Sequence, residues 1–203
     1  MQMGFYFDQT RCTGCCACRV ACKDWFDLPP GEASRMRILY NEEGKWPDVR
    51  VKYMIMTCFH CLDPVCIDAC DVRALFKRDK DGIVAINTGV CTGLEECGGK
   101  CLKACPYEVP QFGPEANAKM WKCDLCVERL SQNKQAICVE ACPTRALDVA
   151  PLEELKEKYG EGEVKTGKTG KVRVENQDEF FISLRTNPAI VINPKIAENV
   201  PSA

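Results

Sequence analysis

Short apolar stretches, each followed by closely spaced cysteines, set the pattern of much of the chain. Residues 4–8 and 51–56 are predicted strands, and each leads into a cysteine-bearing loop. Residues 73–77 and 83–87 are predicted to pair as a hairpin, because an Asp-Gly pair between them favours a tight reversal. The repeating unit is therefore a strand, a cysteine loop, a short helix and a further strand.

A weak internal repeat indicates that this unit is duplicated. The triplet Arg-Ala-Leu occurs at residues 73–75 and again at 145–147, each time shortly after a cysteine group. Short strands that alternate with short helices and long loops predict an α+β fold. Residues 26–48 interrupt the pattern as a loop-rich insertion that contains several Pro and Gly residues, and we expect it at a surface or an interface.

The C-terminal part of the chain has a different character. Residues 151–159 carry apolar side chains at helical spacing, and residues 160–170 are a predicted loop rich in Gly and Lys. The apolar residues 189–192 lie between prolines, with too little surrounding sequence to bury themselves. We therefore divide the chain into a body, residues 1–155, and an extended partner-binding tail, residues 156–203.

Cysteine dominates the composition, with 17 of the 203 residues. The hydrophobic share of 46% includes these cysteines, so something besides ordinary side-chain packing must hold the interior together. The 27 Lys and Arg residues nearly balance the 29 Asp and Glu residues and are scattered, which predicts no nucleic acid partner. The single His excludes His-rich zinc sites and His-based metal catalysis.

No segment predicts export or membrane insertion. Residues 1–7 lack a basic region followed by a long apolar stretch. The longest apolar runs, 54–56 and 189–192, fall short of the roughly 20 residues that a membrane-spanning helix needs. We therefore expect the protein either in the cytoplasm or exported together with a signal-bearing partner, with any membrane association arising through partners.

Sixteen cysteines form four groups of four, each ending in C-x3-C. The groups are Cys12, Cys15, Cys18 and Cys22; Cys58, Cys61, Cys66 and Cys70; Cys91, Cys97, Cys101 and Cys105; and Cys123, Cys126, Cys138 and Cys142. The first group has the bacterial ferredoxin spacing C-x2-C-x2-C-x3-C, in which three thiolates hold one cluster and the fourth points to another. Four such groups predict four 4Fe-4S clusters. Cys16 is left over, and we expect it to be a bystander because Cys15 already has the required spacing.

Two other uses of cysteine are less consistent with this pattern. A disulfide framework is disfavoured by the odd count and by tight spacings that would strain many pairings. Structural zinc explains two-residue spacings equally well, but four groups that all end in C-x3-C would be unusual in a zinc protein. Replacement of one cluster by a 3Fe-4S cluster, or by an empty site, stays an alternative.

The segments around the cysteines resemble one protein family. Residues 5–15, 21–25, 58–66 and 122–147 are similar to the iron-sulfur (beta) subunit of the dimethyl sulfoxide reductase family of molybdenum and tungsten oxidoreductases. The resemblance covers about residues 4–155. The third cysteine group departs from the family pattern, because it reads C-x5-C-x3-C where the family begins C-x2-C-x2-C.

The resemblance implies two ferredoxin-like dicluster halves in which the groups exchange their last ligands. The implied ligand sets are Cys12, Cys15, Cys18 and Cys142; Cys123, Cys126, Cys138 and Cys22; Cys58, Cys61, Cys66 and Cys105; and Cys91, Cys97, Cys101 and Cys70. Because distant groups would bind each other's clusters, we expect folding and cluster assembly to be one event.

The resemblance also implies electron transfer rather than bond chemistry, and no catalytic residue. The expected protein is a subunit that relays single electrons between a catalytic subunit with a molybdenum or tungsten pterin cofactor and a membrane anchor or other redox partner. The alternative is an independent polyferredoxin-type carrier that serves a hydrogenase or a formate dehydrogenase. The insertion and the tail favour the first, because a diffusing carrier needs neither.

Residues near the ligands are expected to have secondary roles. Basic side chains beside the clusters are expected to offset negative charge and raise reduction potentials: Arg11, Arg19, Lys23, Lys103, Lys122 and Arg129. His60 is expected to pack locally rather than to donate a hydrogen bond to cluster sulfur. Trp25 and Trp46 are expected to pack around the insertion.

Overall fold

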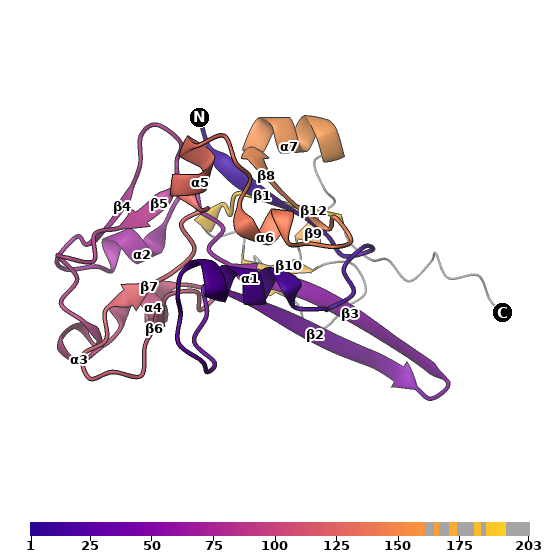
Figure 1. The fold of residues 1–203 in the computed structure, drawn as a ribbon, viewed down its shortest axis with the longest axis horizontal. Coiled ribbons are helices and arrows are strands. Elements are labelled where there is room, and N and C mark those ends of the chain that lie inside the picture. The colour runs from indigo at the N-terminus through magenta and orange to yellow at the C-terminus, as the bar shows by residue number, and fades with distance from the viewer. Residues whose placement is uncertain (161–164, 167–170, 174–180, 184–185, 194–203) are drawn as a thin grey trace.

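Small sheets, short helices and long loops make up the protein in the computed structural model, which confirms the α+β prediction (Figure 1). Residues 1–160 and 186–193 are described with their side chains, and residues 165–166, 171–173 and 181–183 by their backbone. The three short segments are β9 (Lys165–Thr166), β10 (Lys171–Arg173) and β11 (Phe181–Ser183), which form a sheet of order β11-β10-β9.

The central sheet has the order β12-β1-β8 and joins the two ends of the described residues. β1 (Met3–Asp8) pairs antiparallel with β8 (Leu147–Pro151) and parallel with β12 (Ile190–Asn193). α7 (Leu152–Tyr159) packs against all three strands. The predicted strand at 4–8 and the predicted helix at 151–159 are therefore confirmed.

The prediction that residues 189–192 cannot bury themselves is wrong. Ala189, Val191 and Ile192 are at most 2% exposed, because β12 lies beside β1 and packs against α7. A strand that pairs with a strand near the opposite end of the sequence can be buried without any covering residues close to it in the sequence. The loop predicted at 160–170 lies mostly outside the described residues, and a partner-binding role for residues 156–203 stays a prediction.

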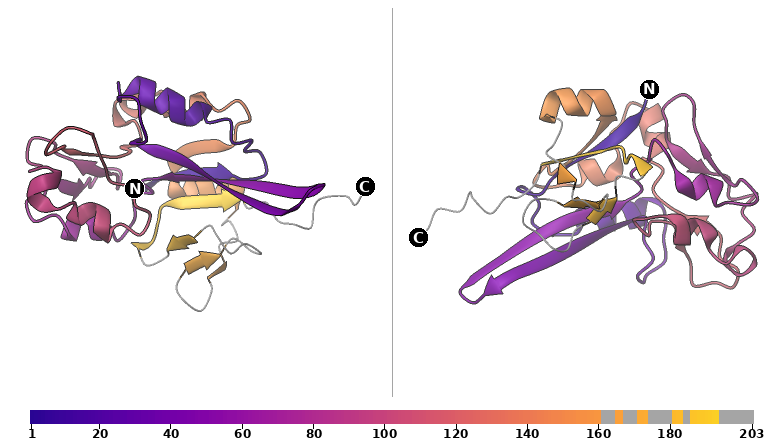
Figure 2. Two further views of the ribbon diagram at one scale, coloured as in Figure 1. Left: turned by 90° about the horizontal axis from the view of Figure 1, so that it is seen from below. Right: turned by 180° about the vertical axis from the view of Figure 1, so that it is seen from behind.

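A long hairpin projects from the body (Figures 1 and 2). β2 (Met36–Lys45) pairs antiparallel with β3 (Asp48–Thr57), from Met36 opposite Thr57 to Lys45 opposite Asp48. The predicted strand at 51–56 is part of β3, but the second half of the insertion at 26–48 is strand and not loop. Gly44, one of the glycines that indicate a loop, lies near the hairpin tip with φ +92°, a conformation that side chains other than glycine rarely adopt.

Short elements carry or flank the cysteines. Two further hairpins pair β4 (Leu75–Lys77) with β5 (Val84–Ile86), as predicted, and β6 (Gln111–Phe112) with β7 (Met120–Trp121). The helices are α1 (Ala17–Trp25), α2 (Val65–Asp68), α3 (Leu94–Cys97), α4 (Lys100–Ala104), α5 (Val127–Ser131) and α6 (Ile137–Glu140). The main core contains cysteines among aromatic and aliphatic side chains, so the interior is built around thiols.

Candidate metal centres

The structure brings sixteen cysteines together as four sets, each with three members of one sequence group and one of another. We call them site 1 (Cys12, Cys15, Cys18, Cys142), site 2 (Cys22, Cys123, Cys126, Cys138), site 3 (Cys58, Cys61, Cys66, Cys105) and site 4 (Cys70, Cys91, Cys97, Cys101). Sites 1, 3 and 4 each line a cavity. The members of site 2 lie close enough to affect one another's pKa values.

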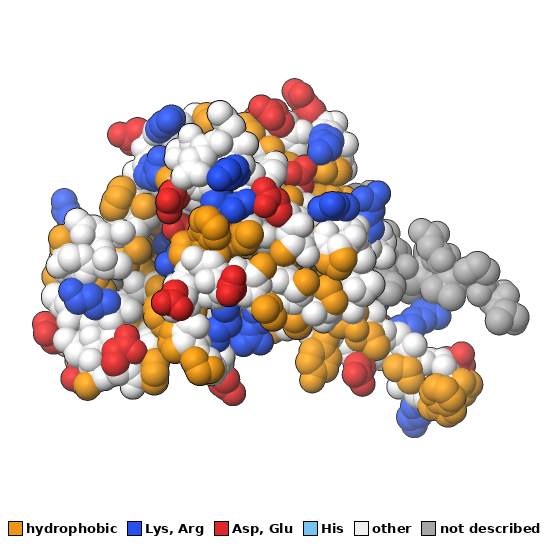
Figure 3. Space-filling model, in the orientation of Figure 1, with side chains coloured by type: hydrophobic (Ala, Val, Ile, Leu, Met, Phe, Trp, Pro, Cys, Tyr) orange, Lys and Arg blue, Asp and Glu red, His pale blue; other side chains and the backbone are white. Residues whose placement is uncertain are grey.

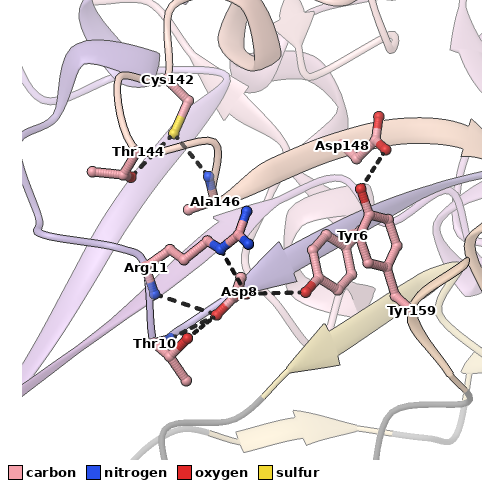
Figure 4. Close-up of polar contacts among 9 residues, drawn as sticks. All are labelled: Tyr6, Asp8, Thr10, Arg11, Cys142, Thr144, Ala146, Asp148 and Tyr159. Atoms are coloured by element: carbon pink, nitrogen blue, oxygen red, sulfur yellow. Dashed lines mark hydrogen bonds and ion pairs between the residues drawn. The ribbon is translucent and has the colours of Figure 1, made fainter.

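Site 1 is formed where the loop after β1 meets the loop before β8 (Figure 4). Asp8 shapes the first loop, because its carboxylate accepts hydrogen bonds from the backbone N–H groups of Thr10, at 2.9 Å, and Arg11, at 3.3 Å. The backbone N–H of Ala146 donates to Cys142 Sγ at 3.2 Å. Hydrogen bonds of this kind to sulfur orient a ligand and tune the metal that it holds.

Cys16 also borders the cavity of site 1. Its backbone has φ +60°, and its Sγ donates to the carbonyl oxygen of Gly14 at 3.4 Å. That contact turns the thiol back onto its own loop, which is consistent with a bystander role, although the expectation that Cys16 is no ligand stays a prediction.

Site 2 is the most deeply buried of the sets. Burial raises the pKa of Cys123 and of Cys138 well above the ordinary value, and neighbouring acidic groups raise them further. Leu125 and Cys126 both have positive φ, which turns the loop so that the Leu125 N–H donates to Cys123 Sγ at 3.3 Å. These thiols stay protonated at neutral pH unless positive charge is placed among them.

Two arginines flank site 2, and each is paired with a carboxylate. Arg35 contacts Asp124 at 3.3 Å, and Arg129 contacts Glu140. The Arg129 guanidinium also lies 4.8 Å from the centre of the Trp25 ring, so Trp25 packs beneath a cation near site 2. Trp46, by contrast, lies at the hairpin tip and is 88% exposed, so the expectation that it packs around the insertion is wrong.

Site 3 has walls from three distant parts of the sequence. Phe59 and Tyr107 line its cavity and meet edge to face, with ring centres 5.0 Å apart. Burial raises the pKa of the Cys61 thiol to about 11, and a hydrogen bond from the Thr186 side chain opposes that rise. The Thr186 hydroxyl also shares a 2.9 Å hydrogen bond with the Tyr107 hydroxyl.

Thr186 is a site residue that sequence reasoning missed. The same segment clamps the second cysteine loop, because the N–H groups of Leu62 and Asp63 donate to the carbonyls of Asn187 and Thr186. No motif marks this segment, so the sequence offers no signal for it. Residues 186–193 therefore pack against the part of the protein that carries the cysteines, while the division at residue 155 stays a prediction.

Site 4 contains the atypically spaced third group and encloses the largest of the three cavities. Its volume is about 230 Å³, against about 20 Å³ at sites 1 and 3. α3 occupies part of the long spacing between Cys91 and Cys97, and α4 begins just before Cys101. The two helices are separated by Gly98 and Gly99, with φ +62° and +65°. The glycines thus turn the backbone between Cys97 and Cys101, so that the long spacing still leads both cysteines to one cavity.

The donor chemistry fits iron-sulfur clusters. All 17 cysteines lie in the described part of the protein and are free thiols. No three His, Cys, Asp or Glu side chains of the described residues could hold a single metal ion. Instead, three of the four sets each line a cavity, and backbone N–H groups donate to Cys123 of site 2 and Cys142 of site 1. Proteins hold 4Fe-4S clusters with four thiolates and with N–H donors of this kind.

Residues 49–151 match the family model described as a 4Fe-4S dicluster domain. This protein belongs to that family. It is 42% identical over 168 residues to the B subunit of the anaerobic dimethyl sulfoxide reductase of Escherichia coli, and the match covers 79% of this protein and 78% of that subunit. The Haemophilus influenzae protein of the same name is also 42% identical over 168 residues, covering 78% of each sequence. Protein NrfC of Escherichia coli is 36% identical over 156 residues, covering 76% of this protein and 67% of NrfC.

These findings confirm the resemblance on which the sequence-based expectations rest. The protein is an iron-sulfur protein of mixed α and β structure, and its relatives include subunits of anaerobic dimethyl sulfoxide reductases. In the part of the protein that the structure describes, no helix has the length and apolar character to span a bilayer.

Proposed function

We propose that this protein is the electron-transfer subunit of an oxidoreductase complex and holds four 4Fe-4S clusters, one in each of sites 1 to 4. When bound, such a cluster accepts and releases one electron at a time. The protein's own residues supply the thiolates, the N–H donors to sulfur and the apolar walls that keep water away. The observation that carries the proposal is the assembly of four complete sets of four cysteines from exchanged groups.

Contacts between the sets support a single path for electrons. Cys18 of site 1 lies close enough to Cys138 of site 2 to raise its pKa, and Cys58 of site 3 does the same to Cys123 of site 2. Sites 3 and 4 are linked by α2, which carries Cys66 and leads directly into Cys70. We therefore infer the order 1, 2, 3, 4, with sites 1 and 4 at the two ends.

The proposed partners are a catalytic subunit with a molybdenum or tungsten pterin cofactor at one end and a membrane anchor or other redox partner at the other. The relatives support this, because two of those described above are named as parts of anaerobic dimethyl sulfoxide reductases. The projecting hairpin also supports it, because Trp46 at its tip is 88% exposed and Tyr40, halfway along β2, is 69% exposed. Figure 3 shows hydrophobic side chains gathered at the tip. Large exposed apolar side chains are typical of surfaces that a partner covers. Any membrane association is proposed to arise through such partners.

Metal analysis of protein purified without oxygen tests the cluster assignment. We expect a brown protein with about 16 iron and about 16 acid-labile sulfide per polypeptide. About 12 iron, or a 3Fe-4S signal, would show that one site departs from the proposal. A colourless preparation that contains zinc would overturn it.

Co-purification distinguishes the proposed subunit of a complex from the alternative, an independent electron carrier. The tagged protein is expressed with and without the genes that neighbour its own, and the proposal expects a stable complex with a pterin-containing subunit. A protein that stays monomeric with all neighbours present, yet reduces or oxidises a hydrogenase or formate dehydrogenase, would favour the independent carrier.

A further inference from the structure

Lys122 is a buried cation between two of the cysteine sites. It follows β7 directly, precedes Cys123 of site 2 and is 3% exposed. Its side chain lines the cavity of site 3 together with Cys66 and Cys105. Its Nζ donates to the carbonyl oxygen of Cys123, at 3.0 Å, and to that of Val84. The two carbonyl groups therefore fix the ammonium group in place beside the cavity of site 3.

Lys122 differs from other buried cations in having no anionic partner. The other buried cations of the described residues, Arg129 and Lys52, are each paired with a carboxylate, those of Glu140 and Glu43. Among the described residues, no carboxylate lies within ion-pair distance of Lys122, whose contacts are neutral carbonyl groups. A buried charge without a counter-ion is strongly unfavourable, so natural proteins rarely contain one.

The surroundings of Lys122 point to the missing anion. His60 lies close enough to Lys122 for the lysine charge to lower its pKa further, after burial, and its Nδ1 accepts a hydrogen bond from the Val84 N–H. A neutral imidazole provides no negative charge. The cysteines of site 3 are different. Burial raises the pKa of the Cys66 thiol, and the positive charge of Lys122 opposes that rise by favouring the thiolate. An anion held in the site 3 cavity would meet the ammonium group without any rearrangement.

We propose that Lys122 is the built-in counter-ion of the cluster in site 3 and that its charge raises the reduction potential of that cluster. The inference rests on the proposed function. A 4Fe-4S core with four thiolates is negatively charged, and reduction adds a further electron. A fixed positive charge in a dry environment stabilises the reduced form more than a surface charge does, because solvent screens it less. Lys122 is thus a positioning residue for electron transfer.

Redox titrations followed by EPR on the anaerobically purified complex test this proposal. Lys122→Met keeps the length and apolar stem but removes the charge, and Lys122→Arg keeps the charge. The matched control is Lys103→Met, because Lys103 is another basic residue that the sequence places beside ligands, between Cys101 and Cys105. Its side chain is exposed, so solvent screens its charge. Iron content is measured for each variant, so that a change of potential is compared only between fully loaded proteins.

The expected result is a lower midpoint potential for one cluster in Lys122→Met. The shift should correspond to at least a tenfold change in the ratio of reduced to oxidised cluster, about 59 mV for one electron. Lys122→Arg and Lys103→Met should change this ratio by less than threefold. Equal potentials in Lys122→Met and the wild-type protein, or an equal shift in Lys103→Met, would overturn the proposal.

Loss of the cluster in Lys122→Met is also informative. If iron is lost in both Lys122→Met and Lys122→Gln but kept in Lys122→Arg, the result supports a counter-ion role for Lys122. If iron is lost in all three variants, only the packing of the lysine side chain matters, and the proposal is overturned. A wild-type protein without 4Fe-4S clusters would instead refute the proposed function itself. The two failures are therefore distinguishable.

Discussion

The hydroxyl groups of Thr186 and Tyr107 share a 2.9 Å hydrogen bond in the wall of site 3. Both residues are buried, although nearly eighty positions separate them in the sequence. Tyr107 follows the third cysteine group, and Thr186 precedes the last strand of the central sheet. This contact couples the C-terminal part of the protein to a site whose cysteines all lie in the first 105 residues.

Truncation after residue 160 is expected to reduce iron content and stability. It removes β12 and Thr186, and with them the clamp on Leu62 and Asp63 beside Cys61. Loss of buried side chains such as Ile192 costs about 2–5 kcal/mol each. Iron per polypeptide and thermal unfolding measure the effect.

The control for this truncation stops after residue 193 and keeps every described residue of the tail. It should retain the full iron content. If the protein ending at 160 also retains it, with unchanged cluster spectra, the coupling of the tail to site 3 is not needed for cluster binding.

Exchange of the last ligands predicts which cluster each serine variant affects. Cys22→Ser should alter the cluster in site 2, and Cys142→Ser the cluster in site 1, because each thiol lies with the cysteines of the other group. EPR spectra of the reduced proteins distinguish the two. A Cys22→Ser variant in which the site 1 signal alone changes would show that the groups do not exchange.

Cys16→Ser is expected to keep all clusters, with about 16 iron per polypeptide. The Cys16 thiol donates to Gly14, and a serine hydroxyl can make the same hydrogen bond. Iron analysis checks this, with Cys15→Ser as the matched variant one position away. A loss of about four iron in Cys16→Ser would identify it as a ligand.

The raised pKa of Tyr6 predicts that the folded protein loses stability at alkaline pH. Burial, followed by the charge of Asp8 and the hydrogen bond to it, raises the pKa of Tyr6 to about 12 (Figure 4). The unfolded protein loses this proton near pH 10, so the folded form binds more protons between pH 10 and pH 12 and its stability falls across that range. Its contribution is complete below pH 10 and amounts to about 2 kcal/mol.

Tyr6→Phe isolates this contribution. Phe keeps the stacking on Tyr159, whose ring centre lies 3.6 Å away, but removes the ionisable hydroxyl. Unfolding curves at pH 8 and pH 11.5 should converge for the two proteins as pH rises. An equal dependence of stability on pH in both would show that Tyr6 does not contribute.

The cysteine spacing determined the chemistry of this protein, because three ligands of each proposed cluster come from one short segment. The loop geometry that directs Cys12, Cys15 and Cys18 to one cavity is local, and local sequence can encode it. The same holds for the β4–β5 hairpin, which an Asp-Gly turn specifies. Family, fold class and iron-sulfur character could therefore be predicted from the sequence.

Only the tertiary structure determined the contacts between residues that lie far apart in the sequence. The parallel pairing of β12 with β1 leaves no periodic signal, since each strand is short and the two lie near opposite ends of the protein. In sequence the hairpin tip resembles a loop, because a glycine such as Gly44 is common both in the tight turn of a hairpin and in an irregular loop. The isolation of Lys122 from every described carboxylate is likewise a property of three-dimensional neighbours. Sequence spacing specifies which atoms can bind, whereas burial and charge pairing depend on segments that meet only in the folded protein.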